Sequence, residues 1–422
     1  MQRVRIGIIG TGVSVEWAIL PALLGPDVLS PPDTGAWWQR RPAPSGDIRY
    51  QAPASPVVMA LGEAPNDAQF SEGKEGKAGK ISARLEVLGR AARDAALYAT
   101  PRALLREMPL DALLIAGGDE EIDCAALADL VARAPGAQQN IAPPRWIWID
   151  GAPARTLAGL GAFARASSGG PSLWIAAPLR RAAAHRAARR LLERDGIGEV
   201  TAIQARFPFA LDAARFGAAY AAFDLLLSFV PAGHGAPREV FAIRHPDGAA
   251  SLVLKLAGGA SISALFGAAD IWNAPLPRLE ICGTQGRFLV CESGRRLWHH
   301  VPREGARLWE PPGLAAHVSA SNVSGYAEDL KAFLEVCVNN PAPFNAERAL
   351  DDAARTLGAL EGAFASLQSG TTQHIEARGT LLAAGAAPFP SAKHTFGSPR
   401  TAHDFDAPAT VTPPRNLTLE LS

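Results

Sequence analysis

The sequence contains little lysine, although its total charge is balanced. Its 422 residues include 41 basic and 41 acidic side chains, so the formal net charge at pH 7 is zero. Only six of the basic residues are lysine, and none lies between Lys80 and Lys255. A zero net charge argues against a nucleic-acid-binding protein, because such proteins carry an excess of basic residues. The lysine-free interval excludes any mechanism that requires an ammonium group from the middle of the chain.

Cysteines and long apolar runs are also scarce. No Cys-x-x-Cys pair and no zinc-site spacing occurs among the four cysteines, which are Cys124, Cys282, Cys291 and Cys337. No stretch approaches the roughly 18 consecutive apolar residues of a membrane helix, and the chain opens on a strand pattern rather than a signal peptide. With 48% hydrophobic and 19% charged residues, the sequence predicts a soluble, cytoplasmic protein with reduced thiols and no membrane partner.

The first half of the chain alternates strand and helix patterns. Residues 3–10 form a short β-rich run that leads into Gly10, Thr11 and Gly12 and then into an apolar helix at 16–24. This order of strand, glycine turn and helix is typical of the start of a dinucleotide-binding unit. Further strands are expected at 56–61, 111–117, 145–149 and 173–176, and helices at 81–97, 101–107, 122–133, 153–166 and 178–193. The alternation predicts a doubly wound parallel sheet.

After residue 198 the pattern changes to consecutive strands. These are expected at 199–207, 239–244, 250–256, 260–266, 278–283 and 287–291, with hairpin links at 245–248 and 258–259 and one helix at 212–229. They predict a large, open, mostly antiparallel sheet, closed by helices at 326–339 and 345–369. We therefore divide the chain into a first domain at 1–152 with an inserted loop at about 25–54, an α/β sheet domain at 153–370, and a C-terminal arm at 371–422.

Five segments in this order carry a resemblance to a known family. They are Gly10-Thr11-Gly12 with the helix Ile19-Leu20-Pro21-Ala22-Leu23, the stretch from Tyr98 to Ala116, Ile197-Gly198-Glu199-Val200, Ile281-Cys282-Gly283-Thr284-Gln285-Gly286, and the closing helices with Phe333 and Glu361 to Gly370. Over roughly residues 3–370 the chain resembles the glucose-fructose oxidoreductase, inositol dehydrogenase and MocA family. The resemblance implies a Rossmann-type domain that binds a dinucleotide, followed by a sheet domain for substrate and dimerisation.

The resemblance places the cofactor at the glycine turn. The backbone from Gly10 through Thr11, Gly12 and Val13 would approach the pyrophosphate, and Gly117 at the end of the 111–117 strand would also contact the cofactor. The third glycine position of the strict fingerprint is Val15. Glu63, after the second strand, is the candidate for the ribose hydroxyls, the alternative being an exposed acid at a strand end. A carboxylate there favours NAD(H) over NADP(H), because it repels a 2′-phosphate.

The chain departs from the family at its catalytic residues. Active members carry Glu-Lys-Pro after the strand that here ends at Ile149; aligning the proline on Pro153 places Ala152 at the lysine. A different gap puts Asp150 at the glutamate and still provides no lysine.

The second catalytic element of the family, a helix with the pattern Asp-x-Gly-x-His-x-x-Asp, is also incomplete in this chain. Only Asp224 of that pattern remains, because Gly217 stands at the first aspartate and Ala221 at the histidine. Hydride transfer from an alcohol needs a group that accepts the hydroxyl proton, and alanine cannot do so. The chain is therefore expected to be a divergent member that lacks the usual catalytic lysine and histidine.

Other polar residues are candidates for the site. Asp224 and Tyr220 are the catalytic candidates, although Tyr220 is one helical step of about 100° from the histidine position and packing is its alternative role. Arg180, Arg181 and His185 open a helix where the family often places substrate-contacting residues, and paired arginines can hold a carboxylate or phosphate; their alternative is a solvated helix face. Arg206, on the first strand of the large sheet, is a further substrate-binding candidate. No metal site is expected.

The sequence supports two hypotheses of function, one for an enzyme and one for a non-catalytic protein. The first is an NAD(H)-dependent oxidoreductase that acts on a small polar metabolite with a rearranged proton-transfer group. The second is a non-catalytic family member that acts as a binding or partner subunit of another enzyme, which leaves open whether any dinucleotide is bound. The resemblance also implies a homodimer or a dimer of dimers, with a hetero-partner as the alternative.

Overall fold

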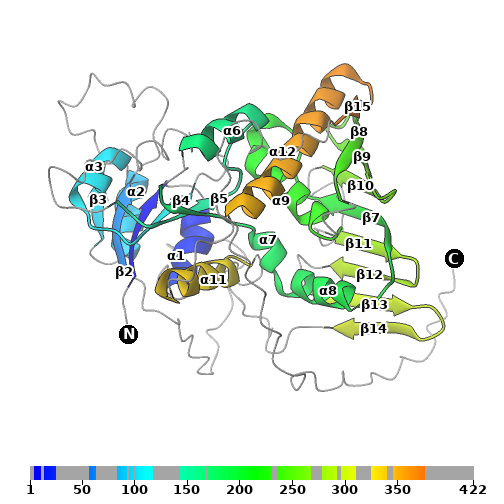
Figure 1. Ribbon diagram of the computed structural model, residues 1–422, viewed down its shortest axis with the longest axis horizontal. Coiled ribbons are helices and arrows are strands. Elements are labelled where there is room, and N and C mark those ends of the chain that lie inside the picture. Colours follow the sequence, from blue (N-terminus) through cyan, green and yellow to red (C-terminus); the bar gives the residue numbers. More distant parts are fainter. Residues whose placement is uncertain are drawn as a thin grey trace, which may run out of the picture. The chain divides into compact units, whose positions relative to one another are not determined.

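The architecture was derived from a computed structural model that describes residues 4–10, 14–24, 57–62, 83–92, 95–98, 100–116, 143–166, 170–194, 196–230, 235–267, 278–291, 296–309, 325–339 and 346–375. These residues form two sheets with helices on their faces (Figure 1). The expected α/β fold class, with a parallel sheet followed by a larger antiparallel one, is confirmed.

The first sheet has six strands in the order β3-β2-β1-β4-β5-β6. Every neighbouring pair in it is parallel. The strands are β1 (Arg5–Ile9), β2 (Val57–Gly62), β3 (Ala96–Tyr98), β4 (Ala112–Ala116), β5 (Trp146–Asp150) and β6 (Ser172–Ile175). This is the strand order of a dinucleotide-binding doubly wound fold, in which the order reverses between β1 and β4. The sheet includes β6, so it extends beyond residue 152, and the domain boundary itself stays a prediction.

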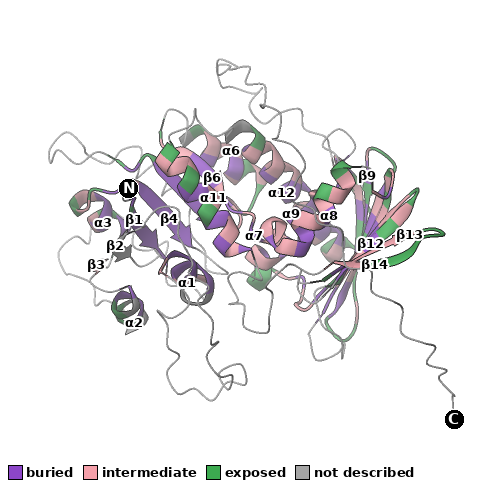
Figure 2. Ribbon diagram, turned by 90° about the horizontal axis from the view of Figure 1, so that it is seen from below, coloured by how far each residue is buried: buried purple, intermediate pink, exposed green. Residues whose placement is uncertain are grey.

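Apolar side chains on both faces explain why helices cover this sheet on each side (Figure 2). One face packs on η1 (Val15–Ile19), α1 (Leu20–Leu24), α2 (Ala83–Ala91) and α11 (Tyr326–Asn339). The other face packs on α3 (Pro101–Glu107) and α6 (Leu157–Ala166). Along β5 the alternation is direct, since Trp148 points to the first group of helices and Ile147 and Ile149 to the second. Burial of α11 here brings a helix from the last third of the chain onto the first sheet.

The helix after the glycine turn begins with a widened turn. Residues Val15–Ile19 form a π-helix that continues directly into α1, and the backbone N–H of Leu20 donates to the carbonyl of Val15. Pro21 has no N–H to donate and its ring crowds the carbonyl four residues earlier, which accounts for a local rearrangement of the helical hydrogen bonds.

The second sheet has nine strands in the order β14-β13-β12-β11-β7-β10-β9-β8-β15. Only the β10–β7 pair is parallel. The strands are β7 (Val200–Phe207), β8 (Pro237–Arg244), β9 (Ala250–Leu256), β10 (Ser261–Phe266), β11 (Arg278–Gly283), β12 (Gly286–Cys291), β13 (Arg296–Val301), β14 (Gly305–Trp309) and β15 (Gln373–His374).

Helices cover one face of this sheet and leave the other exposed. The inner face packs on α9 (Phe216–Leu227) and α12 (Ala346–Ser369), and α8 (Ala183–Glu193) packs beside β12 and β13 (Figure 1). Alternation places residues such as Leu252 and Leu254 inside and Val253 outside. Exposed and half-buried residues alternate with buried ones along β7, β8 and β9. These strands therefore have a packed inner face and a more exposed outer face.

The structure differs from the expected elements at three places. The helix expected at 81–97 ends at Ala91, and Ala96–Tyr98 instead form edge strand β3, because pairing with β2 decides the structure of so short an apolar run. The helix expected at 178–193 is broken at Ala182, whose ψ of 140° separates α7 (Pro178–Arg181) from α8. Strands β13 and β14 were not expected, because their sequences show no clear alternation of apolar and polar residues.

Several other expectations lie outside the described residues: the inserted loop at 25–54, the helix at 122–133 and the C-terminal arm at 371–422 beyond residue 375. The start of that arm is described and includes β15, which pairs with β8. Within the described part of the chain, no helix is long and apolar enough to cross a membrane.

Candidate functional site

The carboxyl ends of β1 and β4 meet at the point where the strand order reverses, which is where doubly wound folds bind ligands. Gly10 lies at the end of β1 with φ of 114°, in the region that favours glycine. A Cβ on Gly10 would lie 2.1 Å from the carbonyl oxygen of Ala116 at the end of β4. The two strand ends therefore approach so closely that only glycine fits, as a ligand-binding turn at this position requires.

The other predicted cofactor-binding residues, Thr11, Gly12, Val13, Glu63 and Gly117, lie outside the described residues. Their roles stay predictions.

Asp150 ends β5 beside this point, and its carboxyl group is almost completely buried, with 8% of the residue exposed. The hydroxyl of Tyr326, the first residue of α11, donates a hydrogen bond of 2.7 Å to Asp150 Oδ1. Burial raises the pKa of Asp150, while Tyr326 and the hydroxyl of Ser14 oppose the increase. Ser14 Oγ therefore lies near the Asp150 carboxyl, but among the described residues neither Asp150 Oδ2 nor Ser14 Oγ makes a well-formed hydrogen bond.

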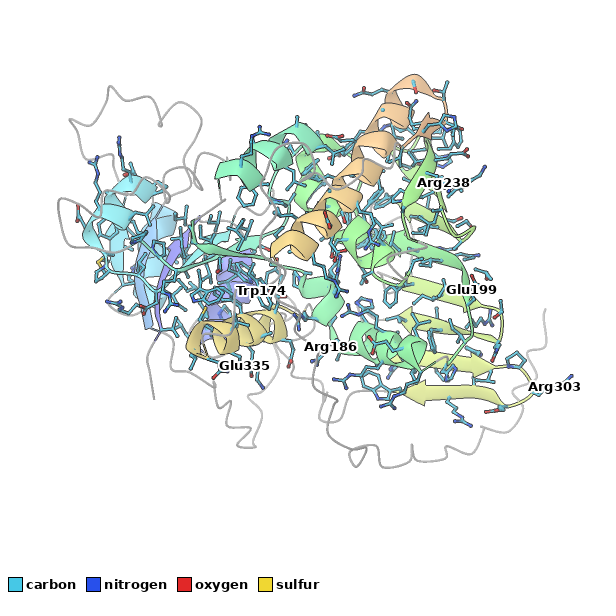
Figure 3. The ribbon with its side chains drawn as sticks, viewed as in Figure 1. Trp174, Arg186, Glu199, Arg238, Arg303 and Glu335 are labelled. Carbon is cyan, nitrogen blue, oxygen red and sulfur yellow. The ribbon has the colours of Figure 1, made fainter. Side chains whose placement is uncertain are left out.

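A second buried carboxylate, Asp329, fixes α11 to the first sheet. Its Oδ2 accepts hydrogen bonds from the indole N–H groups of Trp148, at 2.8 Å, and Trp174, at 3.0 Å. Figure 3 shows Trp174 between the sheet and α11, where its ring packs edge-on against Phe333. Burial raises the pKa of Asp329, and the indole donors and Arg181 partly offset this. Because all these donors converge on one group, Asp329 is a structural anchor for the helix that carries Tyr326.

Arg181 takes part in this anchor. Its Nε lies 3.5 Å from Asp329 Oδ1, and its guanidinium carbon lies 5.6 Å from the centroid of the Trp174 ring. About a third of its side chain is exposed, so one face of the guanidinium contacts protein and another contacts solvent. Arg181, a predicted substrate-binding residue, thus also has a structural role.

The structure brings the predicted catalytic Asp224 together with the predicted substrate-binding Arg180. Arg180 Nε donates to Asp224 Oδ2 at 2.6 Å, and its NH2 group pairs with Asp224 Oδ1. A third contact of 3.0 Å joins Arg180 to Asp352 on α12. Burial and the neighbouring carboxylate of Asp352 raise the pKa of Asp224, while Arg180 opposes this. The pair therefore links α7, α9 and α12 in an internal ion-pair network, in which each side chain satisfies the other.

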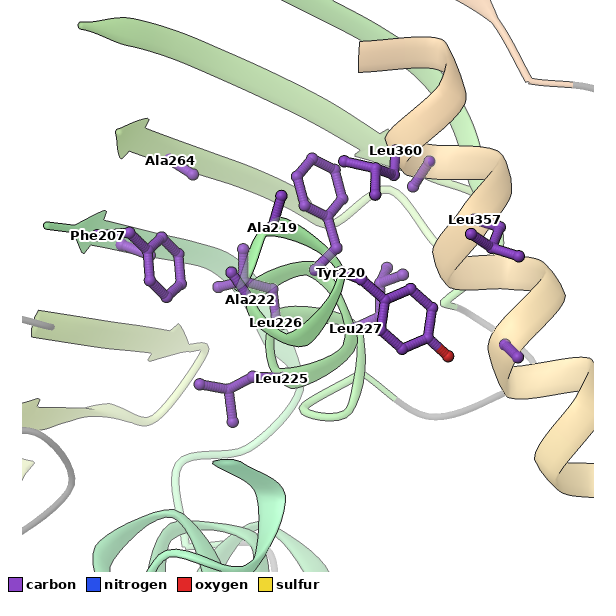
Figure 4. Packing of buried hydrophobic residues seen from close by; sticks show 14 of the residues in the cluster. Phe207, Ala219, Tyr220, Ala222, Leu225, Leu226, Leu227, Ala264, Leu357 and Leu360 are labelled. Carbon is purple, nitrogen blue, oxygen red and sulfur yellow. The ribbon is translucent and has the colours of Figure 1, made fainter. Parts of the chain in front are cut away.

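Tyr220, the other catalytic candidate, points from α9 toward α12 within a cluster of buried apolar residues (Figure 4). Only 2% of the residue is exposed. Burial, with the nearby charge of Asp224, raises the pKa of Tyr220 well above its usual value. The hydroxyl is therefore held in its protonated form, in the surroundings of a packing residue.

The remaining substrate candidates lie apart from each other. His185 is buried on α8, with Nδ1 2.7 Å from the carbonyl oxygen of Leu179 and its ring edge-on to Phe229. Burial lowers the pKa of His185 to about 4, so it is neutral at physiological pH and not on a solvated helix face. Arg206 lies at an exposed position of β7 on the outer face of the large sheet. Their predicted substrate contacts stay predictions.

Sequence reasoning named Asp150 only as an alignment position and did not identify Tyr326 or Asp329 as polar contacts. A tyrosine and two acids at the start of an amphipathic helix look like ordinary first-turn residues, and only the tertiary fold reveals their partners on β5 and β6. No group of three metal-binding side chains occurs within the residues that the structure describes.

No protein-family model and no curated protein matches the sequence. Solved structures do match. An oxidoreductase from Agrobacterium radiobacter in complex with NAD+, L-tartaric acid and magnesium is 16% identical with a TM-score of 0.62, covering 89% of this chain and 99% of its own. A levoglucosan dehydrogenase in complex with NADH and levoglucosan is 15% identical with a TM-score of 0.63, covering 89% of this chain and 100% of its own.

A dehydrogenase from Chromobacterium violaceum is 16% identical with a TM-score of 0.62, covering 88% of this chain and 96% of its own. The match extends over almost the full length of these proteins. The protein therefore has the fold of these oxidoreductases.

Proposed function

We propose that the chain is a divergent member of the glucose-fructose oxidoreductase, inositol dehydrogenase and MocA family that binds NAD(H) at the carboxyl ends of β1 and β4. The observation that carries the proposal is the close approach of Gly10 to Ala116 at the reversal of the strand order. The solved neighbours support it, because several were crystallised with NAD+ or NADH.

The residues at this edge fit a dinucleotide. Gly10 leaves room for a backbone turn, and the orphaned oxygens of Ser14 and Asp150 are polar groups that a ligand can satisfy. The turn from Gly10 to Val13 would hold the pyrophosphate, Gly117 would line the same edge, and Glu63 would bind the ribose hydroxyls and disfavour NADP(H). Bound there, the dinucleotide would supply or accept a hydride.

The chemistry on the substrate side is atypical. Ala152 and Ala221 stand where the family resemblance places lysine and histidine. On α9, Asp224 is paired with Arg180 and Tyr220 is buried and protonated, so neither resembles a proton acceptor of the usual kind. A small polar metabolite remains the substrate class that we propose, with the proton handled by a group outside α9.

The alternative is a non-catalytic member that binds a ligand or supports another enzyme. One observation favours it: the Arg180–Asp224–Asp352 network joins three helices with groups that a catalytic site would present to a substrate. In this alternative the network is purely structural, and the dinucleotide site is either a binding site without turnover or unused.

Calorimetric titration of the full-length protein with NADH, NADPH, NAD+ and NADP+ tests the proposal. NAD(H) should bind more tightly than NADP(H), and Glu63→Gln should narrow the difference, because the repulsion of the 2′-phosphate is removed. A circular dichroism spectrum of each variant checks that it is folded. If no dinucleotide binds at millimolar concentration, the oxidoreductase proposal fails.

We also propose that two copies associate through the outer face of the large sheet. Three of the exposed large apolar side chains lie together there, on neighbouring strands: Phe241, Ile243 and Val253. An antiparallel sheet with one solvent-exposed apolar face is stabilised when that face is covered. A homodimer, or a dimer of dimers, would cover it, and a different protein partner is the alternative.

A further inference from the structure

The missing lysine and histidine leave the site without an assigned proton carrier. We propose that Asp150 fills this role: its carboxyl group, held by Tyr326 through Oδ1 and with Oδ2 unpaired among the described residues, is the acid–base group of the site. The inference rests on the proposed function, because it assigns a residue to the nicotinamide dinucleotide site proposed above.

The position of Asp150 is the first argument. It is the last residue of β5, and β5 neighbours β4, whose end meets Gly10. The hydrogen bond from Tyr326 places the carboxyl on the face of the first sheet where η1 and α11 pack together, and Ser14, at the start of η1, acts on its pKa. Asp150 therefore lies at the edge of the sheet where doubly wound folds bind their ligands.

The hydrogen bonding of Asp150 is the second argument. Tyr326 donates to Oδ1, which fixes the orientation of the carboxyl group and occupies one of its two oxygens. The other oxygen, Oδ2, and the Ser14 hydroxyl are both buried, and neither makes a well-formed hydrogen bond among the described residues, although Ser14 lies near enough to act on the Asp150 carboxyl. Buried polar atoms are normally paired, so a ligand hydroxyl or carbonyl that bonds to both groups would complete their hydrogen bonding.

The ionisation of Asp150 is consistent with this role. Burial raises its pKa, and so does the neighbouring carboxylate of Asp329, while Tyr326 and Ser14 lower it. These are the titratable and hydrogen-bonding groups that act on Asp150, and they come from α11 and from the start of the helix after the glycine turn. A carboxyl group with a raised pKa holds its proton more readily than a solvated carboxyl group does, which suits a group that must both accept and donate a proton.

The proton balance is simple. An alcohol oxidised at this site would lose its hydroxyl proton to Asp150 Oδ2 as the carbon–oxygen double bond forms. Its carbon-bound hydrogen would leave with both electrons to a nicotinamide dinucleotide, the oxidant. In the reverse direction the protonated Asp150 would return that proton to the carbonyl oxygen.

This assignment has a consequence that needs no substrate. The oxidised nicotinamide ring carries a positive charge and the reduced ring is neutral. A nearby positive charge favours an ionised carboxylate, so NAD+ should lower the pKa of Asp150 and displace its proton, whereas NADH should not. The two forms of the cofactor should therefore bind with different proton counts.

The test is calorimetry of the full-length protein with NAD+ and with NADH, each in two buffers of different ionisation enthalpy, which yields the number of protons exchanged. We expect NAD+ to release up to about one proton per site and NADH to release none. In Asp150→Asn the difference should vanish. The matched control is Asp111→Asn, which alters a carboxylate at the opposite edge of the same sheet, where Arg5 lowers the pKa of Asp111, and it should leave the difference unchanged.

Tyr326→Phe gives a second, milder variant if Asp150→Asn does not fold. Loss of the donor to Oδ1 should raise the pKa of Asp150 further, so proton release on NAD+ binding should move to higher pH. Equal proton counts for NAD+ and NADH, or a difference that persists in Asp150→Asn, would overturn the assignment. Failure of either dinucleotide to bind would instead remove the proposed function on which it rests, and the two failures are distinguishable.

Discussion

Arg180 and Asp224, which come from helices α7 and α9, bind each other through two parallel hydrogen bonds. The paired arrangement of a guanidinium and a carboxylate is among the strongest polar contacts in proteins. Both side chains are largely buried, with 16% and 9% of their surfaces exposed. The sequence predicted separate roles for these two residues, substrate binding for Arg180 and catalysis for Asp224. In the structure their opposite charges neutralise each other, so the pair can remain buried between three packed helices.

Removing one partner of this pair should destabilise the fold strongly. Asp224→Ala leaves the guanidinium of Arg180 with Asp352 as its remaining partner, and breaking a buried ion pair typically costs about 3–5 kcal/mol. Urea denaturation of the variant should show a reduction of that order in the free energy of unfolding. Arg180→Met combined with Asp224→Leu should lose less, because no unpaired charge remains.

Arg190→Ala supplies the control for this experiment. Arg190 lies on α8, is exposed, and its removal should change the free energy of unfolding by no more than about 0.5 kcal/mol. If Asp224→Ala is as stable as the wild-type protein while dinucleotide-dependent turnover is lost, the pair is not structural and Asp224 acts in catalysis.

The alternation of strands and helices predicted the parallel sheet because its strands are buried on both faces and its helices are short and regular. The antiparallel sheet followed from period-two patterns such as Leu252 and Leu254 with Val253 between them. The hydrophobic pattern did not predict the strands near the edges of the two sheets. Ala96–Tyr98 became β3 through pairing with β2, and β13 pairs with β12 although its sequence mixes polar and apolar residues.

The site was less predictable than the fold. Gly10 could be recognised because its role depends on backbone geometry encoded locally by glycine. The contacts of Asp150 with Tyr326 and of Trp148 with Asp329 join residues 176 and 181 positions apart, and no local pattern encodes such contacts. Likewise, the arginines at 180 and 181 suggested an anion site, because the sequence does not reveal that Asp224 and Asp329 already pair with them.

His185 should make stability depend on pH in the acidic range. Its pKa in the folded protein is lowered to about 4 from 6.5, so the unfolded chain binds the additional proton between these values. Stability is therefore complete above pH 6.5 and is lost as pH falls toward 4, by roughly 3 kcal/mol in total. The free energy of unfolding of wild type should fall between these pH values more than that of His185→Leu.

This prediction is tested by comparing how steeply the free energy of unfolding changes with pH in wild type and in His185→Leu. His185→Leu loses the hydrogen bond to Leu179 and is expected to be less stable at neutral pH, so absolute stabilities are not informative. Parallel pH profiles for the two proteins would show that His185 is not buried in its neutral form.

Asp150 should have the opposite effect at higher pH. Its pKa is raised in the folded protein, so its contribution to stability is full below the unfolded value and is lost as pH rises through the folded value. Each unit by which the pKa is raised corresponds to about 1.4 kcal/mol. Asp150→Asn removes the cost of ionising the buried carboxyl, so its melting temperature relative to wild type should increase as the pH rises above about 4.

Asp111→Asn is again the informative control, because the pKa of Asp111 is lowered by its hydrogen bond to Arg5. Its effect should have the reverse sign: wild type gains stability relative to this variant as pH rises from the acidic range. A relative melting temperature of Asp150→Asn that does not change with pH would mean that the carboxyl group is solvated in solution.

The outer face of the large sheet gives the last prediction. Phe241, Ile243 and Val253 are 38%, 47% and 43% exposed and lie on paired strands. A charge at Val253 should make covering this face unfavourable, so Val253→Glu is expected to be monomeric by light scattering at a concentration where wild type is dimeric or tetrameric. Val87→Glu is the matched control, since Val87 is 46% exposed on α2 of the first sheet and should leave the assembly intact. A wild-type protein that is monomeric at micromolar concentration would show that the face is not used by a second copy, and association that survives Val253→Glu would place the contact elsewhere.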